Sequence, residues 1–173
     1  MAGDGASDWM FSKGDAITML GDDHERIRRL LGEFARCRDQ NETALCVQLA
    51  TLVCNEIEIH STLEAEIFYP AARRVIEHPM LVDEAEIEHE TLANLIGTVR
   101  GQGPQDSKWY AAMAVLGQYV RQHTDDEERE LFWLMRKSGL DLGALGRDIL
   151  ARRAELDQKY DLSHPNTAKA LPA

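Results

Sequence analysis

The chain has 173 residues, which is enough for one domain with a buried core. Its 30 acidic and 19 basic side chains give a formal net charge of −11 at pH 7, which argues against nucleic acid and anionic membranes as partners, because phosphate binding needs clustered positive charge. No apolar run approaches the roughly 20 residues of a membrane span, and the N-terminus lacks the basic and then apolar pattern of a secretory signal, so a cytoplasmic protein is expected.

Helix-length segments with apolar residues three and four positions apart follow one another along the chain. The first helix is expected over about 15–38, and the second begins near Glu42. Pro70 should kink or end this second helix, since proline has no amide hydrogen and clashes with the preceding turn. The third helix, over about 81–100, stops at the helix breakers of 101–104.

The fourth helix can be capped by Asp106 or Ser107 and closes at Gly139. Short loops between successive helices imply antiparallel neighbours. The sequence therefore predicts an all-α fold, an up-down-up-down antiparallel four-helix bundle with an additional C-terminal helix. The expected parts are an N-terminal arm at 1–14, the bundle at 15–138, the C-terminal helix packed on it at 139–160, and a flexible tail at 161–173.

The three cysteines, Cys37, Cys46 and Cys54, are odd in number and show no Cys-x-x-Cys spacing. This usage fits reduced thiols in a cytosol better than a disulfide framework. We expect all three to act as small hydrophobic side chains on helices.

One histidine lies in the apolar stripe of each of the four helices, and two of the four are followed by a glutamate four residues later, on the same helical face. The residues are His24, His60 with Glu64, His89, and His123 with Glu127. A single core histidine is more often a hydrogen-bonded residue than a ligand, but four imidazoles and two carboxylates without cations would be costly to bury. Imidazole and carboxylate together suit non-haem iron, manganese or zinc. The pattern predicts a two-metal site.

Four segments resemble the haemerythrin-like (HHE cation-binding) domain over about 15–136. They are Asp15-Ala-Ile with Asp23-His24, His60 to Pro70 (HSTLEAEIFYP), His89-Glu90, and His123 to Phe132 (HTDDEERELF). The resemblance implies an up-down four-helix bundle that holds two iron ions with an oxo or hydroxo bridge. Glu64 and Glu127 would bridge the irons, and two histidines would bind each one. Manganese or zinc could replace the iron.

The sequence departs from the oxygen-carrying haemerythrins on the third helix. Those carriers have two histidines four residues apart there, whereas this chain has Ala85 one turn before His89. One imidazole is missing, which leaves an open position on both metals instead of one. Carriers also commonly place the fourth-helix carboxylate five residues after its histidine, which would select Glu128. The helical stripe favours Glu127 instead.

Three further residues are candidates for catalytic roles around the metals. Glu56 lies one turn before His60, and Glu88 directly precedes His89, positions at which bacterial proteins that repair iron centres carry glutamates. Either one could relay protons or, like Glu86, add a ligand in place of the missing histidine; the alternative for Glu88 is a solvated helix face. Tyr119 lies one turn before His123, where it could donate a hydrogen bond or simply pack.

The four-histidine, two-glutamate arrangement is similar to that of the iron-centre repair proteins and of mycobacterial haemerythrin-like proteins associated with peroxide decomposition. It favours a di-iron protein that reacts with O2, H2O2 or NO in oxidative or nitrosative defence, with a catalase-like or other oxidoreductase activity. A reversible oxygen carrier or sensor, and an iron-sensing module, remain alternatives. The expected partners are small diatomic or peroxide ligands; the redox partner, and the choice between monomer and homodimer, stay open.

Overall fold

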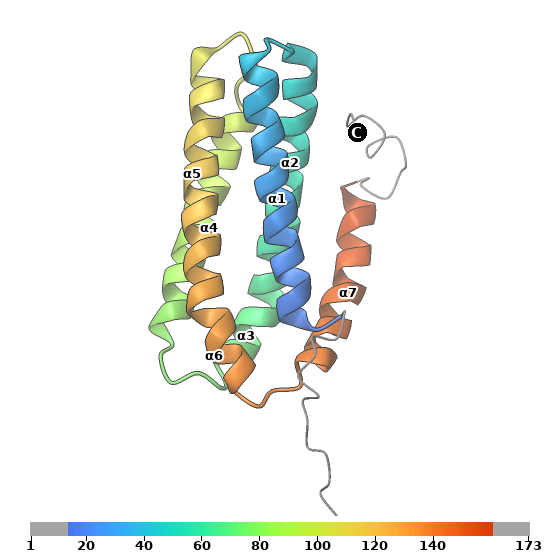
Figure 1. Cartoon of the computed structure of the whole chain (residues 1–173), viewed down its shortest axis with the longest axis vertical. Coiled ribbons are helices and arrows are strands. Elements are labelled where there is room, and N and C mark those ends of the chain that lie inside the picture. The colour runs from blue at the N-terminus through green and yellow to red at the C-terminus, as the bar shows by residue number, and fades with distance from the viewer. Residues whose placement is uncertain (1–13, 161–173) are drawn as a thin grey trace, which may run out of the picture.

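The computed structural model describes residues 14–160, and this part of the chain contains helices and no strand (Figure 1). The expected all-α class is therefore confirmed, while nearly all of the expected arm and the whole C-terminal tail lie outside the described residues. The elements are α1 (Ala16–Asp39), α2 (Thr43–Leu63), the π-helix η1 (Glu64–Phe68), α3 (Tyr69–Ala72), α4 (Met80–Arg100), α5 (Ser107–Arg129), α6 (Leu131–Lys137) and α7 (Leu142–Lys159).

Aspartate side chains cap three of the helices at their first turn. The carboxylate of Asp15 accepts a hydrogen bond from the backbone N–H of Thr18 at 2.9 Å, which starts α1. Asp106 caps α5 and Asp141 caps α7 in the same way. Each cap satisfies an amide that has no partner inside its helix, so these helices begin where their apolar stripes begin.

The long helices α1, α2, α4 and α5 lie alongside one another (Figure 1). In this view α1 and α4 run upward and α2 and α5 run downward, because short loops join α1 to α2 and α4 to α5. Helix α1 packs against α2 and α5, and α4 packs against α5 and α2. Helix α7 covers the outer side of α1 and α2.

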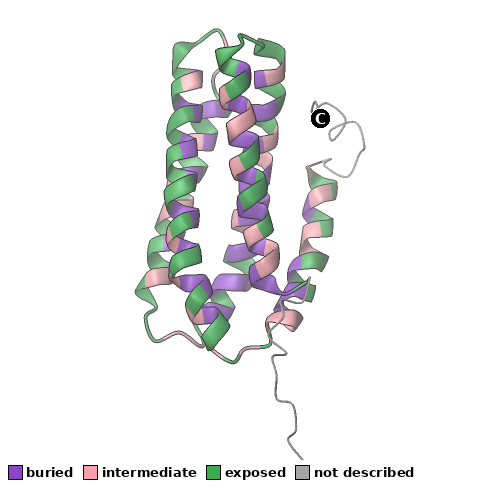
Figure 2. Cartoon of the chain, viewed as in Figure 1, coloured by how far each residue is buried: buried purple, intermediate pink, exposed green. Residues whose placement is uncertain are grey.

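The buried faces of these helices point toward one another (Figure 2) and form two apolar clusters. One cluster fills the half nearer the α1–α2 loop and includes Ile27, Ile57 and Val120. The other fills the half nearer α3 and α6 and includes Leu20 and Leu63. Between the two clusters, the buried faces of these helices carry polar residues. Within 14–160, no helix is long and apolar enough to cross a membrane.

The sequence predicts that Pro70 kinks or ends the second helix, and the structure shows that the helix does not end there. The helical path continues to Ala72, and it does so by widening to a π-helix over Glu64–Phe68, where the amide of Tyr69 bonds to the carbonyl of Glu64. Such a five-residue turn carries one residue more than an α-turn. Pro70 then falls in the first turn of α3, where its missing amide hydrogen costs nothing.

The expected fourth helix is divided in two. Helix α5 ends at Arg129 and α6 begins at Leu131, with Glu130 between them at φ −112° and ψ −63°. The backbone turns here so that Leu131 and Phe132 are both buried.

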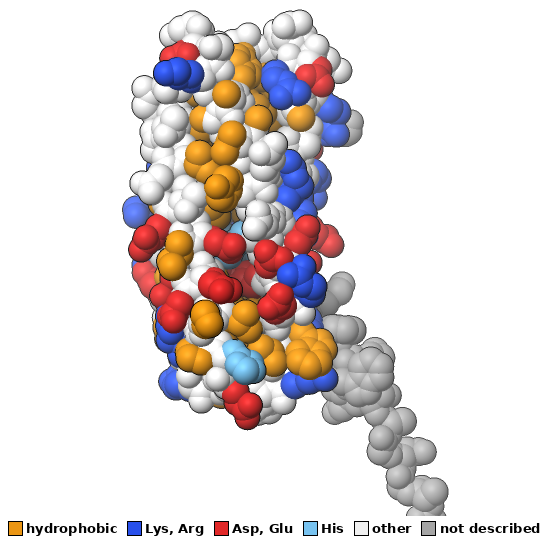
Figure 3. Space-filling view, turned by 90° about the vertical axis from the view of Figure 1, so that its left-hand side faces the viewer, with side chains coloured by type: hydrophobic (Ala, Val, Ile, Leu, Met, Phe, Trp, Pro, Cys, Tyr) orange, Lys and Arg blue, Asp and Glu red, His pale blue; other side chains and the backbone are white. Residues whose placement is uncertain are grey.

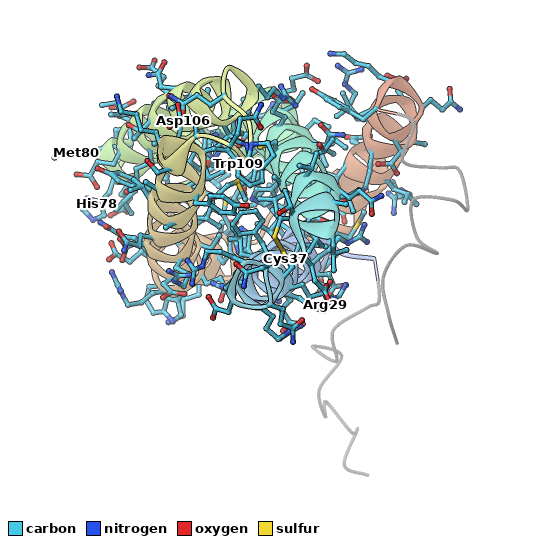
Figure 4. The ribbon with its side chains drawn as sticks, turned by 90° about the horizontal axis from the view of Figure 1, so that it is seen from above. Arg29, Cys37, His78, Met80, Asp106 and Trp109 are labelled. Carbon is cyan, nitrogen blue, oxygen red and sulfur yellow. A yellow bond between two sulfur atoms is a disulfide. The ribbon has the colours of Figure 1, made fainter. Side chains whose placement is uncertain are left out.

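The expectation of three reduced cysteines is wrong for two of them. Cys37, in the last turn of α1, forms a disulfide with Cys46, in the first turn of α2, and their Cα atoms are 5.8 Å apart. Figure 4 shows this bond from above, next to the α1–α2 loop. The tight reversal between the two helices brings the residues together, which their spacing in the sequence did not reveal. Cys54 is a free, buried thiol.

Candidate metal centre

Four histidines from four helices meet between the two apolar clusters. His24 of α1 faces His60 of α2, with 3.0 Å between their Nε2 atoms. His89 of α4 faces His123 of α5, with 3.1 Å between the corresponding atoms. His24, His60 and His123 are buried, and the side chain of His89 is 10% exposed. The helices thus aim four ring nitrogens at one region.

Two buried glutamates link the two histidine pairs. Glu64 Oε2 lies 3.0 Å from His60 Nε2 and 3.2 Å from His89 Nε2. Glu127 Oε2 lies 3.4 Å from His24 Nε2 and 3.9 Å from His123 Nε2. Each carboxylate therefore lies between one histidine of each pair, and the resulting clusters have the composition and spacing of metal sites.

The outer ring nitrogens of two histidines are held by carboxylates. His24 Nδ1 lies 2.8 Å from Glu128 Oε1, and His123 Nδ1 lies 2.7 Å from Glu88 Oε2. A neutral imidazole that donates its Nδ1 hydrogen outward keeps a lone pair on Nε2. This is the tautomer in which a histidine binds a metal through Nε2. Glu128 and Glu88 accordingly favour the tautomer in which Nε2 of His24 and of His123 can accept a metal ion.

Several polar atoms at this centre have no hydrogen-bond partner. In the described part of the chain, five buried side-chain nitrogen or oxygen atoms lack one, and four of the five belong to His60, Glu64 and Glu127. Both carboxylate oxygens of Glu127 are among them. Buried charges without partners are costly, and lone pairs that face one another repel. The donor set therefore fits bound cations.

The pKa values of these groups support the same conclusion. Burial, together with the nearby charge of Glu64, raises the pKa of Glu127 above its ordinary value. Burial opposes ionisation of Glu64 too, but His60 and His89 outweigh it and hold the pKa of Glu64 well below its usual range. Burial would lower the pKa of His60, yet Glu64 and Asp23 raise it to about 10. The cluster is short of positive charge, and protons partly supply it.

Helix α7 also reaches the surroundings of the centre. Arg153, 12% exposed at its side chain, donates hydrogen bonds to Asp23 and, at 2.8 Å, to Glu56. Asp23 Oδ2 in turn lies 3.6 Å from His60 Nδ1, which is ion-pair distance but too long for a hydrogen bond. Burial opposes the charge of Asp23, but His60 and Arg153 outweigh it and keep its pKa below the ordinary value.

The residues expected to relay protons lie in different places. Glu88 contacts the centre through His123. Glu56 is buried, but its two oxygens accept hydrogen bonds from Arg26 and Arg153, so it is held outside the metal-site clusters. Glu86, the other proposed substitute ligand, is bonded to Arg73.

Tyr119 lies outside the buried stripe of α5. It is 45% exposed, because the buried stripe of α5 passes from His123 back to Val120, three residues away, and leaves the position four residues away outside it.

Tyr69 was missed at the sequence level and lies in the centre. Its hydroxyl is 3.4 Å from Glu64 Oε2, to which it donates, and 3.2 Å from His89 Nε2. Burial and the neighbouring Glu64 and Glu127 raise its pKa, so the phenol keeps its proton. A purely α-helical pattern pairs Glu64 with Phe68; only the π-helix brings the fifth residue onto the same face.

Asp23 and Arg153 were also missed, and Glu128, weighed only as the alternative to Glu127, lies instead against His24. Asp23 and Glu128 each stand next to a proposed ligand in the sequence, which is a signal that could have been used. The sequence around Arg153 contained no such signal.

Comparison with known proteins agrees with this geometry. The sequence profile of the Hemerythrin HHE cation binding domain matches residues 15–134. The chain belongs to the haemerythrin HHE cation-binding domain family. It is thus a haemerythrin-like metal-binding domain whose histidine and glutamate cluster lies where the helices of the matched region meet.

A solved structure shares the fold. It is the crystal structure of a Hemerythrin HHE cation binding domain-containing protein from Mycobacterium kansasii, which superposes with a TM-score of 0.71 at 18% sequence identity. The match covers 91% of this chain and 99% of that one. No curated protein is significantly similar to the chain.

Proposed function

We propose that this haemerythrin-like domain is a non-haem di-iron protein that binds and reacts with O2, H2O2 or NO, in defence against oxidative or nitrosative stress. The observation that carries the proposal is the symmetric donor set, in which two histidine pairs are joined by two carboxylates with unpaired oxygens. One iron would be held by His24 and His60 and the other by His89 and His123. Glu64 and Glu127 would bridge them.

Two bound irons would supply electron transfer and Lewis acidity to a small ligand. The protein's own side chains would do the rest. Glu128 and Glu88 keep the Nε2 lone pairs of His24 and His123 directed inward. The ring of Phe132 stacks on His24 at a centroid distance of 5.4 Å and limits access of water from that side. Tyr69 places a protonated hydroxyl beside Glu64 and His89, where it can donate a hydrogen bond.

The bundle gives this centre its rigidity. We infer an up-down-up-down arrangement of α1, α2, α4 and α5 with α7 as an additional C-terminal helix, since each long helix then contributes one histidine. Groups held on rigid elements stay within a few tenths of an ångström of their working positions. Manganese or zinc would fit the same donors, so the metal content of the purified protein decides between them.

The reactive function is favoured over reversible oxygen carriage by Ala85. This residue is buried and stands where a fifth histidine would otherwise lie, so both metals, instead of one, would keep an open position for a reactant. A carrier or sensor without turnover is the alternative, and an iron-sensing module, whose folding depends on metal, is a third reading.

Metal analysis with absorption spectroscopy tests the site. The wild-type protein should hold about two irons per chain and show the near-ultraviolet absorption of an oxygen-bridged iron pair. His60→Ala and Glu127→Ala should lose both, whereas His78→Ala, an exposed histidine away from the cluster, should keep both. Full iron content in His60→Ala and Glu127→Ala would reject the ligand assignment.

Two reactions then separate the functions. Oxygen release after addition of peroxide would support turnover. Reversible oxygen uptake by the reduced protein, with no peroxide decomposition, would support the carrier instead.

A further inference from the structure

A small pocket opens between α4 and α5 beside Ala85. It has a volume of about 130 Å³, and its lining includes His123 and Glu127, both almost fully buried. A larger hollow between α2 and α4 reaches His89 of the centre and no other of the six proposed ligands. The pocket beside Ala85 is therefore the more direct way to the pair of carboxylates and histidines.

Glu127 connects this pocket to the proposed metal centre. It is 4% exposed, it lines the pocket, and neither of its oxygens has a hydrogen-bond partner. A larger residue in place of Ala85 would fill the space in front of it. The small side chain thus leaves a passage that ends at one of the proposed metal ligands.

The mouth of the pocket is acidic. Its outer carboxylates are the exposed Glu84 and the half-buried Asp126 and Glu130, and Glu88 forms a hydrogen bond with His123. The one basic side chain at the mouth, Arg129, pairs with Asp126 and Glu130 and so leaves the balance negative. Figure 3 shows acidic side chains gathered around a hollow in the lower half of this face.

We propose that this pocket is the route and binding site for small uncharged ligands, and that its carboxylates disfavour anions. The proposal rests on the di-iron function above and names the ligand class of the same site. A charged wall inside a narrow, poorly solvated opening repels ions of the same sign and leaves neutral molecules unaffected. H2O2, O2 and NO are all uncharged and small enough for a cavity of this size.

Neutralising the mouth tests the charge selection. In the iron-loaded protein, Glu84→Gln with Glu130→Gln should tighten azide binding, read from its charge-transfer absorption, roughly two- to fivefold at low salt, and the gain should fade near 1 M salt. Nitric oxide binding to the reduced protein should change less than twofold.

The matched control is Asp148→Asn with Glu155→Gln on α7, on the other side of the molecule. Glu155 pairs with Arg152 as Glu130 pairs with Arg129, so the electrostatic change is comparable. Unchanged azide affinity in the mouth variant, or an equal gain in the control, would overturn the charge selection.

Filling the pocket tests the route. Ala85→Leu should slow both azide and nitric oxide binding at least tenfold while iron content stays at the wild-type level. Unaltered binding rates in the loaded variant would show that ligands arrive another way and reject the proposal. If Ala85→Leu does not bind iron, the variant with Glu84→Gln and Glu130→Gln still tests the proposal. These results are distinct from failure of the proposed function, which is tested on the wild-type protein by its iron content and its reaction with peroxide.

Discussion

Arg153 of α7 is bonded to Asp23 of α1, the residue that precedes His24 in the chain. The contact links the last described helix to the first across 130 positions, with 12% of the Arg153 side chain and 6% of the Asp23 side chain exposed. Arg153 also holds Glu56 of α2, so a single guanidinium joins three helices at the level of the histidines. Helix α7 is therefore a structural support of the centre as well as a cover.

Replacing Arg153 should destabilise the protein strongly. Arg153→Met leaves Asp23 and Glu56 as buried charges without this partner, and breaking a buried pair in this way costs about 3 kcal/mol of unfolding free energy. Urea denaturation measures the loss. Arg152→Met, which breaks surface pairs with Glu66 and Glu155 on the same helix, should have little or no effect. Equal stability of the two variants would contradict a supporting role for Arg153.

Removing metal should expose the cost of burying Glu127. In the metal-free protein, Glu127→Gln should be more stable than the wild type, by roughly 1 to 3 kcal/mol, because a neutral amide replaces an unpartnered carboxylate. Adding ferrous iron should raise the melting temperature of the wild type far more than that of the variant. Glu90→Gln, an exposed change on α4, should behave as the wild type does in both states. If iron raises the melting temperature of Glu127→Gln as much as that of the wild type, Glu127 is not a ligand.

The disulfide should stabilise the junction of α1 and α2. Cys37 and Cys46 are separated by nine positions. A bond that closes a loop of this length lowers the entropy of the unfolded chain, which raises the free energy of unfolding by about 2 to 3 kcal/mol. Denaturation with and without reductant checks the value. Alkylation of the unfolded, unreduced protein should label Cys54 alone; three labelled thiols would show that the bond is absent.

Cys54 should give the stability a pH dependence in the alkaline range. Burial raises the pKa of its thiol from 9.0 to about 11, with Arg100 opposing the shift. Because the folded-state pKa is raised, the contribution to stability is fully present below pH 9 and is lost as the pH rises toward 11. The stability of the wild type relative to Cys54→Ala should fall across this window, by up to about 1.4 kcal/mol per pH unit. A constant difference would mean that the thiol ionises equally well in both states.

The helices could be predicted because their apolar stripes and caps are local signals. Asp15 precedes the first stripe, and the breakers after Arg100 end the third, so the structure places both ends near the expected residues. The six residues expected to converge also lie together, since each occupies the buried stripe of its own helix and the loops are short. Apolar periodicity and loop length were therefore sufficient to predict the helices and the convergence of these six residues.

The remaining features depend on tertiary packing. Tyr69 is brought inward by a change of helical hydrogen bonding, which apolar spacing does not encode. Arg153 lies in a helix whose docking surface on α1 and α2 has no sequence signal. Tyr119 is exposed because the buried stripe of α5 steps back from His123 by three residues, to Val120, and the position four residues back falls outside the stripe. The cysteine pair follows from the geometry of one loop.

The π-helix at Glu64–Phe68 changes how this chain should be compared with its relatives. One additional residue in a helical turn rotates everything that follows by about 100° relative to an uninterrupted α-helix. An alignment that pairs residues 60–72 with a regular helix, without a gap, will assign Phe68, Tyr69 and Pro70 to the wrong faces. Any relative that lacks this additional residue should present a different side chain to Glu64, even where the histidine and glutamate before it are the same.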